Sequence, residues 1–311
     1  MKKIISIVAV LFMLVGCSQS VKQTENLVIM TSFYPVYDFT QEVAGDKATV
    51  KLVMPEGVDA HDYEPSPQVV AAIHDADVFV YHGAGMEPWL ESVLSTLNKD
   101  KVKTVELSSV VNLIENSEED HDHEEHDHDD HDGHDHGAFD PHTWLSPKNA
   151  IKEVSLIRDV LSEIDSDNKD TYISNTRSYI SKLQDLDRDF ESLKSLPNHD
   201  FLVDHQAYAY LAHDYGLHQK GLMASMLKEE PTPKELENIL DTIQTEGIKA
   251  FFVDPSNATK LIDVITKETG VKVFPLHTIE SLTKEQIAKG DTYLSLMQEN
   301  FNSLKEGLIR E

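Results

Sequence analysis

Two runs of alternating strand and helix patterns, one on each side of a long helical stretch, constrain the fold of this chain most strongly. In the first run we predict strands over 27–31, 48–54, 77–81 and 102–107, with helices over 35–44, 67–76 and 88–97. In the second run we predict strands over 201–204, 219–222, 248–254 and 271–276, with helices over 207–215, 233–246, 258–269 and 287–309. Strands that alternate with helices form parallel sheets covered by helices on both faces. The chain is therefore predicted to be an α/β protein with two βα lobes.

The stretch between the two runs predicts a pair of linking helices. The first begins at Ser146-Pro147 and ends near Ile164, and the second spans 166–195. The inward side of the second helix consists of residues spaced alternately by four and three, as on one face of a helix: Tyr172, Thr176, Tyr179, Leu183, Leu186, Phe190 and Leu193. At about 1.5 Å per residue this helix is a rod of roughly 40 Å, long enough to contact both lobes. We expect this stripe to provide ordinary core packing and no chemistry.

The first 26 residues have the pattern of a secretion signal followed by a tether. A positively charged start precedes an apolar run over 4–15, which is too short to span a bilayer and is typical of a signal peptide. The residues Leu14-Val15-Gly16-Cys17 resemble a bacterial lipobox, and Cys17 is the only cysteine in the chain. We expect a signal peptide over 1–16 and a lipid on Cys17 that anchors the protein outside the membrane. A plain secretory signal with an incidental cysteine is the alternative.

These patterns predict the domain organisation of the chain. A lipid-anchored tether over 17–26 leads into an N-terminal lobe over 27–147. Linking helices follow over 148–197, and a C-terminal lobe occupies 198–311.

The charge of the chain indicates which partners it attracts. The sequence has 55 acidic and 27 basic residues, with a formal net charge of −28. A nucleic-acid-binding protein needs a basic surface, so nucleic acid is excluded as an expected partner. Cations are attracted instead.

A histidine-acid run over 118–136 points to metal. Its 19 residues comprise seven histidines, eleven acidic residues and one glycine; the histidines are His121, His123, His126, His128, His131, His134 and His136. Such a segment cannot bury a core, so we expect a solvated, mobile loop. Imidazole and carboxylate are both donors for divalent transition metals, although the run does not indicate which one. A solvating acidic linker is the alternative, but acidity alone does not require seven histidines.

Three histidines outside this run lie next to predicted strand or helix ends. His61 lies in VDAHDYEPSP after the second strand, His142 in DPHTWLSP after the histidine-acid run, and His205 in VDHQAY after the first strand of the second lobe. Ligands of open α/β sheets bind beyond the carboxyl ends of strands, so a cleft between the lobes could gather all three. Each has a neighbouring carboxylate that could orient a metal-bound imidazole, namely Asp59 or Asp62, Asp140, and Asp204. Any single loop histidine is more often a surface residue.

Taken together, the two lobes, the lipobox and the motifs HDYEPSP, DPHTWLSP and DHQAYAYLA resemble the metal-binding lipoproteins of bacterial ABC importers. The histidine-rich segment before DPHTWLSP resembles their zinc-specific branch. The resemblance implies two four-stranded, mostly parallel βα lobes joined by a rigid helix, with metal held between the lobes. It implies that His61, His142 and His205 are ligands and that Glu280, after the last strand, is the fourth. His277 is a competing donor three residues earlier, and water is a third possibility.

Three imidazoles and one carboxylate suit tetrahedral zinc. The manganese-selective relatives replace the third histidine by a carboxylate, so His205 favours zinc over manganese. The resemblance implies a monomeric protein, not an enzyme, that captures extracytoplasmic Zn²⁺ and delivers it to the permease and ATPase of an ABC transporter.

Three alternatives remain open from the sequence. If Glu280 is not a ligand, three histidines and a water would form a zinc hydrolase site, with Glu64 or Glu229 as the base. A manganese-binding relative is the second alternative. A surface adhesin or metal buffer without a permease is the third.

Deleting residues 118–136 is expected to leave one tight zinc site, because a segment without a core is a poor place for a single tightly held ion. Calorimetric titration of the deletion variant with Zn²⁺, beside the full chain, counts the tight sites. If the deletion variant had no tight zinc site, the segment would have to be part of the primary site.

Overall fold

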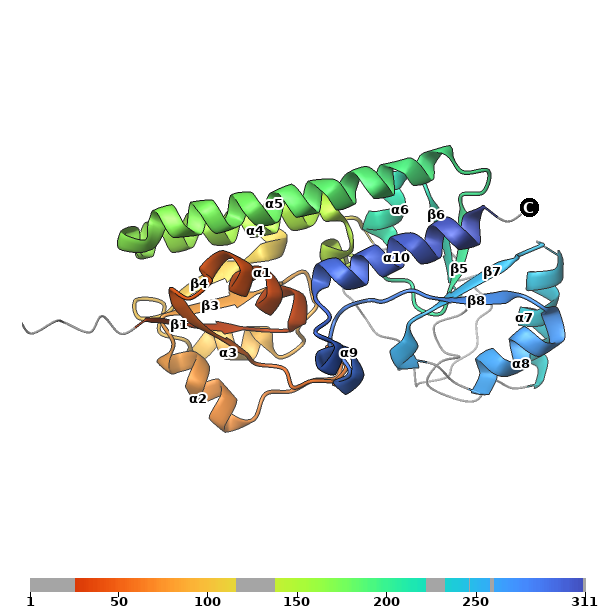
Figure 1. Ribbon diagram of the computed structural model, residues 1–311. Coiled ribbons are helices and arrows are strands. Elements are labelled where there is room, and N and C mark those ends of the chain that lie inside the picture. Colours follow the sequence, from red (N-terminus) through yellow and green to blue (C-terminus); the bar gives the residue numbers. More distant parts are fainter. Residues whose placement is uncertain (1–25, 116–137, 222–232, 246, 258–259, 310–311) are drawn as a thin grey trace, which may run out of the picture.

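The computed structural model describes residues 26–115, 138–221, 233–245, 247–257 and 260–309 (Figure 1). Within these ranges the chain forms two lobes, each built on a parallel four-stranded sheet, as predicted. The signal peptide, Cys17 and the histidine-acid run lie outside the described residues. None of the helices in these ranges has the length and apolar character needed to cross a bilayer.

The N-terminal sheet has the order β2-β1-β3-β4, and every neighbouring pair is parallel. Its strands are β1 (Leu27–Thr31), β2 (Ala48–Leu52), β3 (Val78–Tyr81) and β4 (Lys103–Glu106), with helices α1 (Tyr34–Ala44), α2 (Pro67–Asp75) and α3 (Leu90–Thr96). Successive residues of β3 face opposite sides of the sheet. Val78 and Val80 pack with α1 in one core, whereas Phe79 and Tyr81 pack with α2 and α3 in another. Burial on both faces explains why this strand is apolar throughout.

The C-terminal sheet repeats this arrangement in the order β6-β5-β7-β8. Its strands are β5 (Asp200–Val203), β6 (His218–Gly221), β7 (Ala250–Val253) and β8 (Lys272–Pro275), with helices α6 (Ala209–Tyr215), α7 (Pro233–Thr245) and α8 (Lys260–Thr269). Here Phe251 and Val253 pack toward α7 and α8, whereas Ala250 and Phe252 face the other core.

Of the linking helices, α4 (Pro147–Ile164) packs on α1 of the N-terminal lobe, and α5 (Lys169–Glu191) runs back along both lobes (Figure 1). Short 3-10 turns flank α5 on both sides. All seven residues of the predicted inward stripe are buried, from Tyr172 to Leu193. The Tyr179 hydroxyl donates to Asp38 of α1 at 2.9 Å, and the Tyr215 hydroxyl of α6 donates to Asp187 of α5 at 2.8 Å. The rod is thus fastened to each lobe.

The prediction of a single helix over 287–309 was wrong. The structure has two helices there, α9 (Lys284–Lys289) and α10 (Tyr293–Leu308). Gly290 ends α9 in a left-handed conformation with φ of 74°, which glycine adopts at little cost. The Thr292 side chain then caps α10 by accepting from the Ser295 N–H. The local capping residues override the continuous apolar spacing.

The largest core is shared by both lobes. It contains Ile29 of β1, Leu183 of α5, Phe252 of β7 and Phe301 of α10. Close packing of this kind resists relative movement of the elements that contribute to it. The lobes are therefore held in a fixed relation by a continuous core as well as by the rod.

Glu153 is expected to make the metal-free fold less stable as the pH rises. Burial raises the pKa of this carboxyl from 4.5 to about 7, and within the described chain its Oε2 atom has no hydrogen-bond partner. Because the folded-state pKa is raised, the protonated carboxyl contributes its full stability below pH 4.5. This contribution is lost as the pH rises to 7 and above. Between pH 5 and pH 8, Glu153→Gln should therefore lose less free energy of unfolding than the parent, by up to about 3 kcal/mol.

Chemical denaturation in the presence of a chelator measures this difference. Glu163→Gln, an exposed position of the same helix, is the matched control. An identical pH dependence in the parent and Glu153→Gln would contradict the argument.

Candidate metal centre

Four metal-donating side chains meet between the lobes. His61, His142, His205 and Glu280 each present one donor atom, and all four atoms lie within 4.8 Å of one another. His61 lies in the loop after β2, and His142 begins the 3-10 turn that leads to α4. His205 follows β5 and Glu280 follows β8. The structure thus brings together the three histidines and the acid that were expected to act together, two from each lobe.

The separations between the donor atoms are those of a small coordination shell. The Nε2 atoms of His142 and His205 are 3.3 Å apart. The Glu280 oxygens lie 3.8 Å from His61 Nε2 and 3.7 Å from His142 Nε2. A tetrahedral zinc ion with bonds of about 2.0–2.1 Å has ligand atoms about 3.3–3.4 Å apart. The His142–His205 edge already has this length, and the two edges to Glu280 exceed it by a few tenths of an ångström.

Asp140 orients the His142 ring. Its Oδ1 atom lies 2.8 Å from Nδ1 of His142 and also accepts the His142 backbone N–H at 2.8 Å. This is the carboxylate–imidazole arrangement that directs the other ring nitrogen to a metal. Neighbouring carboxylates also shape the other two histidine loops. Asp59 accepts the backbone N–H of His61 at 2.9 Å, and Asp204 accepts that of His205 at 3.0 Å.

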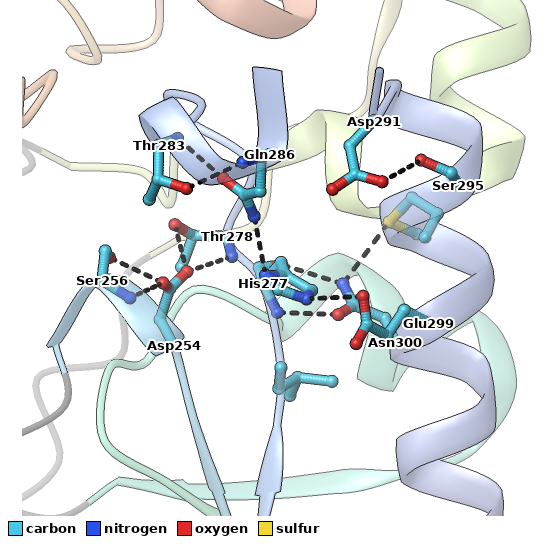
Figure 2. Close-up of polar contacts among 12 residues, drawn as sticks. Asp254, Ser256, His277, Thr278, Thr283, Gln286, Asp291, Ser295, Glu299 and Asn300 are labelled. Carbon is cyan, nitrogen blue, oxygen red and sulfur yellow. Dashed lines mark hydrogen bonds and ion pairs between the residues drawn. The ribbon is translucent and has the colours of Figure 1, made fainter. Parts of the chain in front are cut away.

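A chain of carboxylates links the two ligands of the C-terminal lobe. Asp204, beside His205, also accepts the backbone N–H of Asp254 at 3.2 Å. Asp254 in turn accepts hydrogen bonds from the Thr278 backbone N–H at 2.6 Å and from the Thr278 hydroxyl at 3.0 Å (Figure 2). Its other oxygen accepts from the backbone N–H and the hydroxyl of Ser256. The ends of β5, β7 and β8 are thereby tied together. Asp254 was not among the residues predicted from the sequence, although it lies directly after a buried strand, as the predicted ligand His205 nearly does.

The Glu280 carboxyl is in an environment that disfavours a lone negative charge. Its side chain retains only 12% exposure. Burial, and to a lesser extent the nearby carboxylates of Asp59 and Asp254, raises the pKa of Glu280 to about 8. A divalent cation bound by the four donors would reverse this balance, because it stabilises the ionised form.

His277 belongs to a different group of polar residues. Its Nε2 atom lies 3.2 Å from a Glu299 carboxylate oxygen of α10, and its Nδ1 atom contacts the Gln286 amide of α9 at 3.4 Å (Figure 2). The donor that joins the three histidines is therefore Glu280. The seven histidines of the 118–136 run and Glu229 lie outside the described residues.

Comparison with known proteins identifies relatives over nearly the whole chain. Residues 29–307 match the family described as zinc-uptake complex component A, periplasmic. The chain is 41% identical over 317 residues to the zinc-binding lipoprotein AdcA of Streptococcus pneumoniae, covering all of this chain and 62% of that protein. It is 38% identical over 286 residues to the high-affinity zinc uptake system protein ZnuA of Bacillus subtilis, covering 92% of this chain and 88% of that protein.

A solved structure shares the two-lobed fold. The Zn(II)-bound ZnuA-like domain of S. pneumoniae AdcA matches with a TM-score of 0.80 and 37% identity. The match covers 92% of this chain and 100% of that domain. The chain therefore corresponds to this domain and spans 62% of the length of the pneumococcal relative.

Zinc binding at pH 7 is expected to release about one proton from Glu280 in addition to any from the histidines. A carboxyl with a pKa of about 8 is mostly protonated at pH 7 and must ionise to bind a cation. Glu280→Gln should therefore release about one proton fewer per zinc, and the difference should shrink as the pH rises above 8. Calorimetric titrations in buffers of different ionisation enthalpy count the protons.

Glu299→Gln is the matched control for this measurement, since Glu299 is a half-exposed acid of α10 outside the four-donor group. Equal proton release from Glu280→Gln and the parent would exclude Glu280 as the titrating ligand.

Proposed function

We propose that this chain, which belongs to the family of zinc-uptake complex component A periplasmic proteins, captures extracytoplasmic Zn²⁺ and delivers it to an ABC permease and its ATPase. The observation that carries the proposal is the four-donor group of His61, His142, His205 and Glu280. Because each lobe contributes two donors, the ion would be held between the lobes.

The donor set favours zinc as the cargo. A tetrahedral zinc ion takes four ligands and accepts both imidazole nitrogen and carboxylate oxygen, which is the set present here. A manganese site would be expected to contain more oxygen. The relatives named above as zinc-binding and zinc-uptake proteins support the same choice.

The geometry supports a binding protein over a zinc hydrolase. A catalytic zinc keeps one position open for water and has a base beside it. Here the fourth position would be taken by Glu280, and the nominated base Glu64 is exposed. The matching family is described as a zinc-uptake component, and we propose that this chain binds and delivers zinc and is not an enzyme.

The anchor and the domain boundaries are part of the proposal. A lipid on Cys17 and a tether over 17–26 would hold the N-terminal lobe (27–147), the linking helices (148–197) and the C-terminal lobe (198–311) at the outer face of the membrane as a monomer. The name of the pneumococcal relative, a zinc-binding lipoprotein, supports the anchor.

We propose that the histidine-acid run collects zinc and passes it to the site. The residues flanking the run meet, since Glu115 and Phe139 form an isolated antiparallel bridge and the Asp140 N–H donates to the Ile114 carbonyl at 2.9 Å. The described residues on the two sides of the run are therefore paired, and Phe139 is only three residues before His142 in sequence.

The continuous core suggests how the ion leaves. Because β1, α5 and β7 share one packed core, wide separation of the lobes would disrupt many contacts. We propose that docking on the permease shifts individual ligand loops, and that the lobes move little.

Metal competition on the purified chain tests the choice of zinc. We expect the parent to prefer Zn²⁺ over Mn²⁺, and His205→Glu to reduce this preference at least about tenfold, because the variant replaces an imidazole with a harder oxygen donor. Cells that carry the variant as their only copy should import zinc more slowly than cells with the parent.

His218→Glu, at an exposed position of β6, introduces the same charge away from the site and is the matched control. An unchanged zinc preference in His205→Glu would undo the argument from this residue.

A further inference from the structure

The segment that delivers Glu280 is fixed through its peptide groups. Within residues 276–280, the Leu276 N–H donates to the Val253 carbonyl at 2.9 Å, and the Thr278 carbonyl accepts the Trp144 indole N–H at 2.8 Å. The Glu280 carbonyl accepts the Tyr34 N–H at 3.3 Å. Trp144 and Tyr34 come from the opposite side of the site, so this segment is bonded to both halves of the molecule.

Asn300 makes the most complete of these contacts. Its Oδ1 atom accepts the His277 N–H at 2.7 Å, and its Nδ2 atom donates to the His277 carbonyl at 2.8 Å (Figure 2). Asn300 is 0% exposed and projects from α10. A carboxamide carries an acceptor oxygen and a donor nitrogen side by side, which match the N–H and the carbonyl of a single residue. Without these hydrogen bonds, the buried N–H and carbonyl of His277 would each reduce the stability of the fold by the free energy of their lost hydration.

The residue directly before Glu280 explains why such a clamp is needed. Ile279 has a φ of 61° and is 2% exposed. A β-branched residue rarely adopts this left-handed conformation, which persists only where the surroundings hold it in place. The hydrogen bonds on His277 and Thr278 supply that hold on the side from which the chain enters.

We propose that Asn300 is a positioning residue for Glu280, fixing the strained turn so that the carboxylate meets the three histidines. This inference rests on the function proposed above. Asp254 makes the corresponding contact with Thr278, but its charge also acts directly on the Glu280 carboxyl. Asn300 is neutral, so replacing it changes the geometry of the segment without changing the charge of the site.

The test measures zinc affinity by chelator competition in Asn300→Leu and Asn300→Ala, each made in the parent and in Glu280→Gln. Loss of an outer residue that orients a ligand weakens metal binding by about 10–100-fold, and we expect this loss in the parent background. If Asn300 acts through Glu280, the loss should largely disappear in the Glu280→Gln background. The visible absorption bands of bound Co²⁺, which report coordination geometry, should shift in both Asn300 variants toward those of Glu280→Gln.

Ser303→Ala is the matched control, since Ser303 is also buried on α10 but makes none of the hydrogen bonds to the 276–280 segment described above. Parent-like affinity in the Asn300 variants, or an equal loss in both backgrounds, would overturn the inference. A parent chain without tight zinc binding would instead overturn the proposed function, and this inference with it.

Discussion

The burial of one carboxyl group among three imidazoles is the constraint on which the rest of the structure depends. Glu280 lies within 4 Å of His61 and His142, where burial, together with the carboxylates of Asp59 and Asp254, raises the pKa of its carboxyl to about 8. The same desolvation that disfavours an isolated carboxylate strengthens its attraction to a cation. The surrounding carboxylates, Asp140 on His142 and Asp254 on Thr278, serve to keep these groups converged.

Convergence of donors from two lobes requires that the lobes hold their relation. The packed core that runs from β1 through α5 to β7 and α10 provides this rigidity. Tyr293, at the start of α10, donates to the Trp144 carbonyl at 2.6 Å and packs edge-on against Phe39 of α1. The elements that carry His142 and the Glu280 segment are thus fastened to each other. The four donors can therefore be held together between the lobes without a closing movement of the lobes.

Much of this arrangement could be predicted from the sequence, because strand and helix periodicity is local. Apart from the polar β6, the strands and the buried stripe of the long linking helix follow from apolar spacing, and the site histidines stand out at strand and helix ends. The break between α9 and α10 was missed because the capping by Gly290 and Thr292 outweighs the apolar spacing. The choice between Glu280 and His277 depends on the left-handed Ile279 and on Asn300, which is twenty residues away in sequence. Such long-range contacts leave no periodic signal.

The proposed division of labour between the buried site and the histidine-acid run rests on what selects a metal. Affinity alone would favour copper over zinc for nitrogen and oxygen donors, so selectivity has to come from a fixed number and geometry of ligands. The composition of residues 118–136 supplies many donors but no apolar residues with which to fix them. The buried site has only four donors, but the backbone of each is held in place by hydrogen bonds; the donors are His61, His142, His205 and Glu280. A protein that must tell zinc from its neighbours therefore needs the buried site, whatever the run contributes to supply.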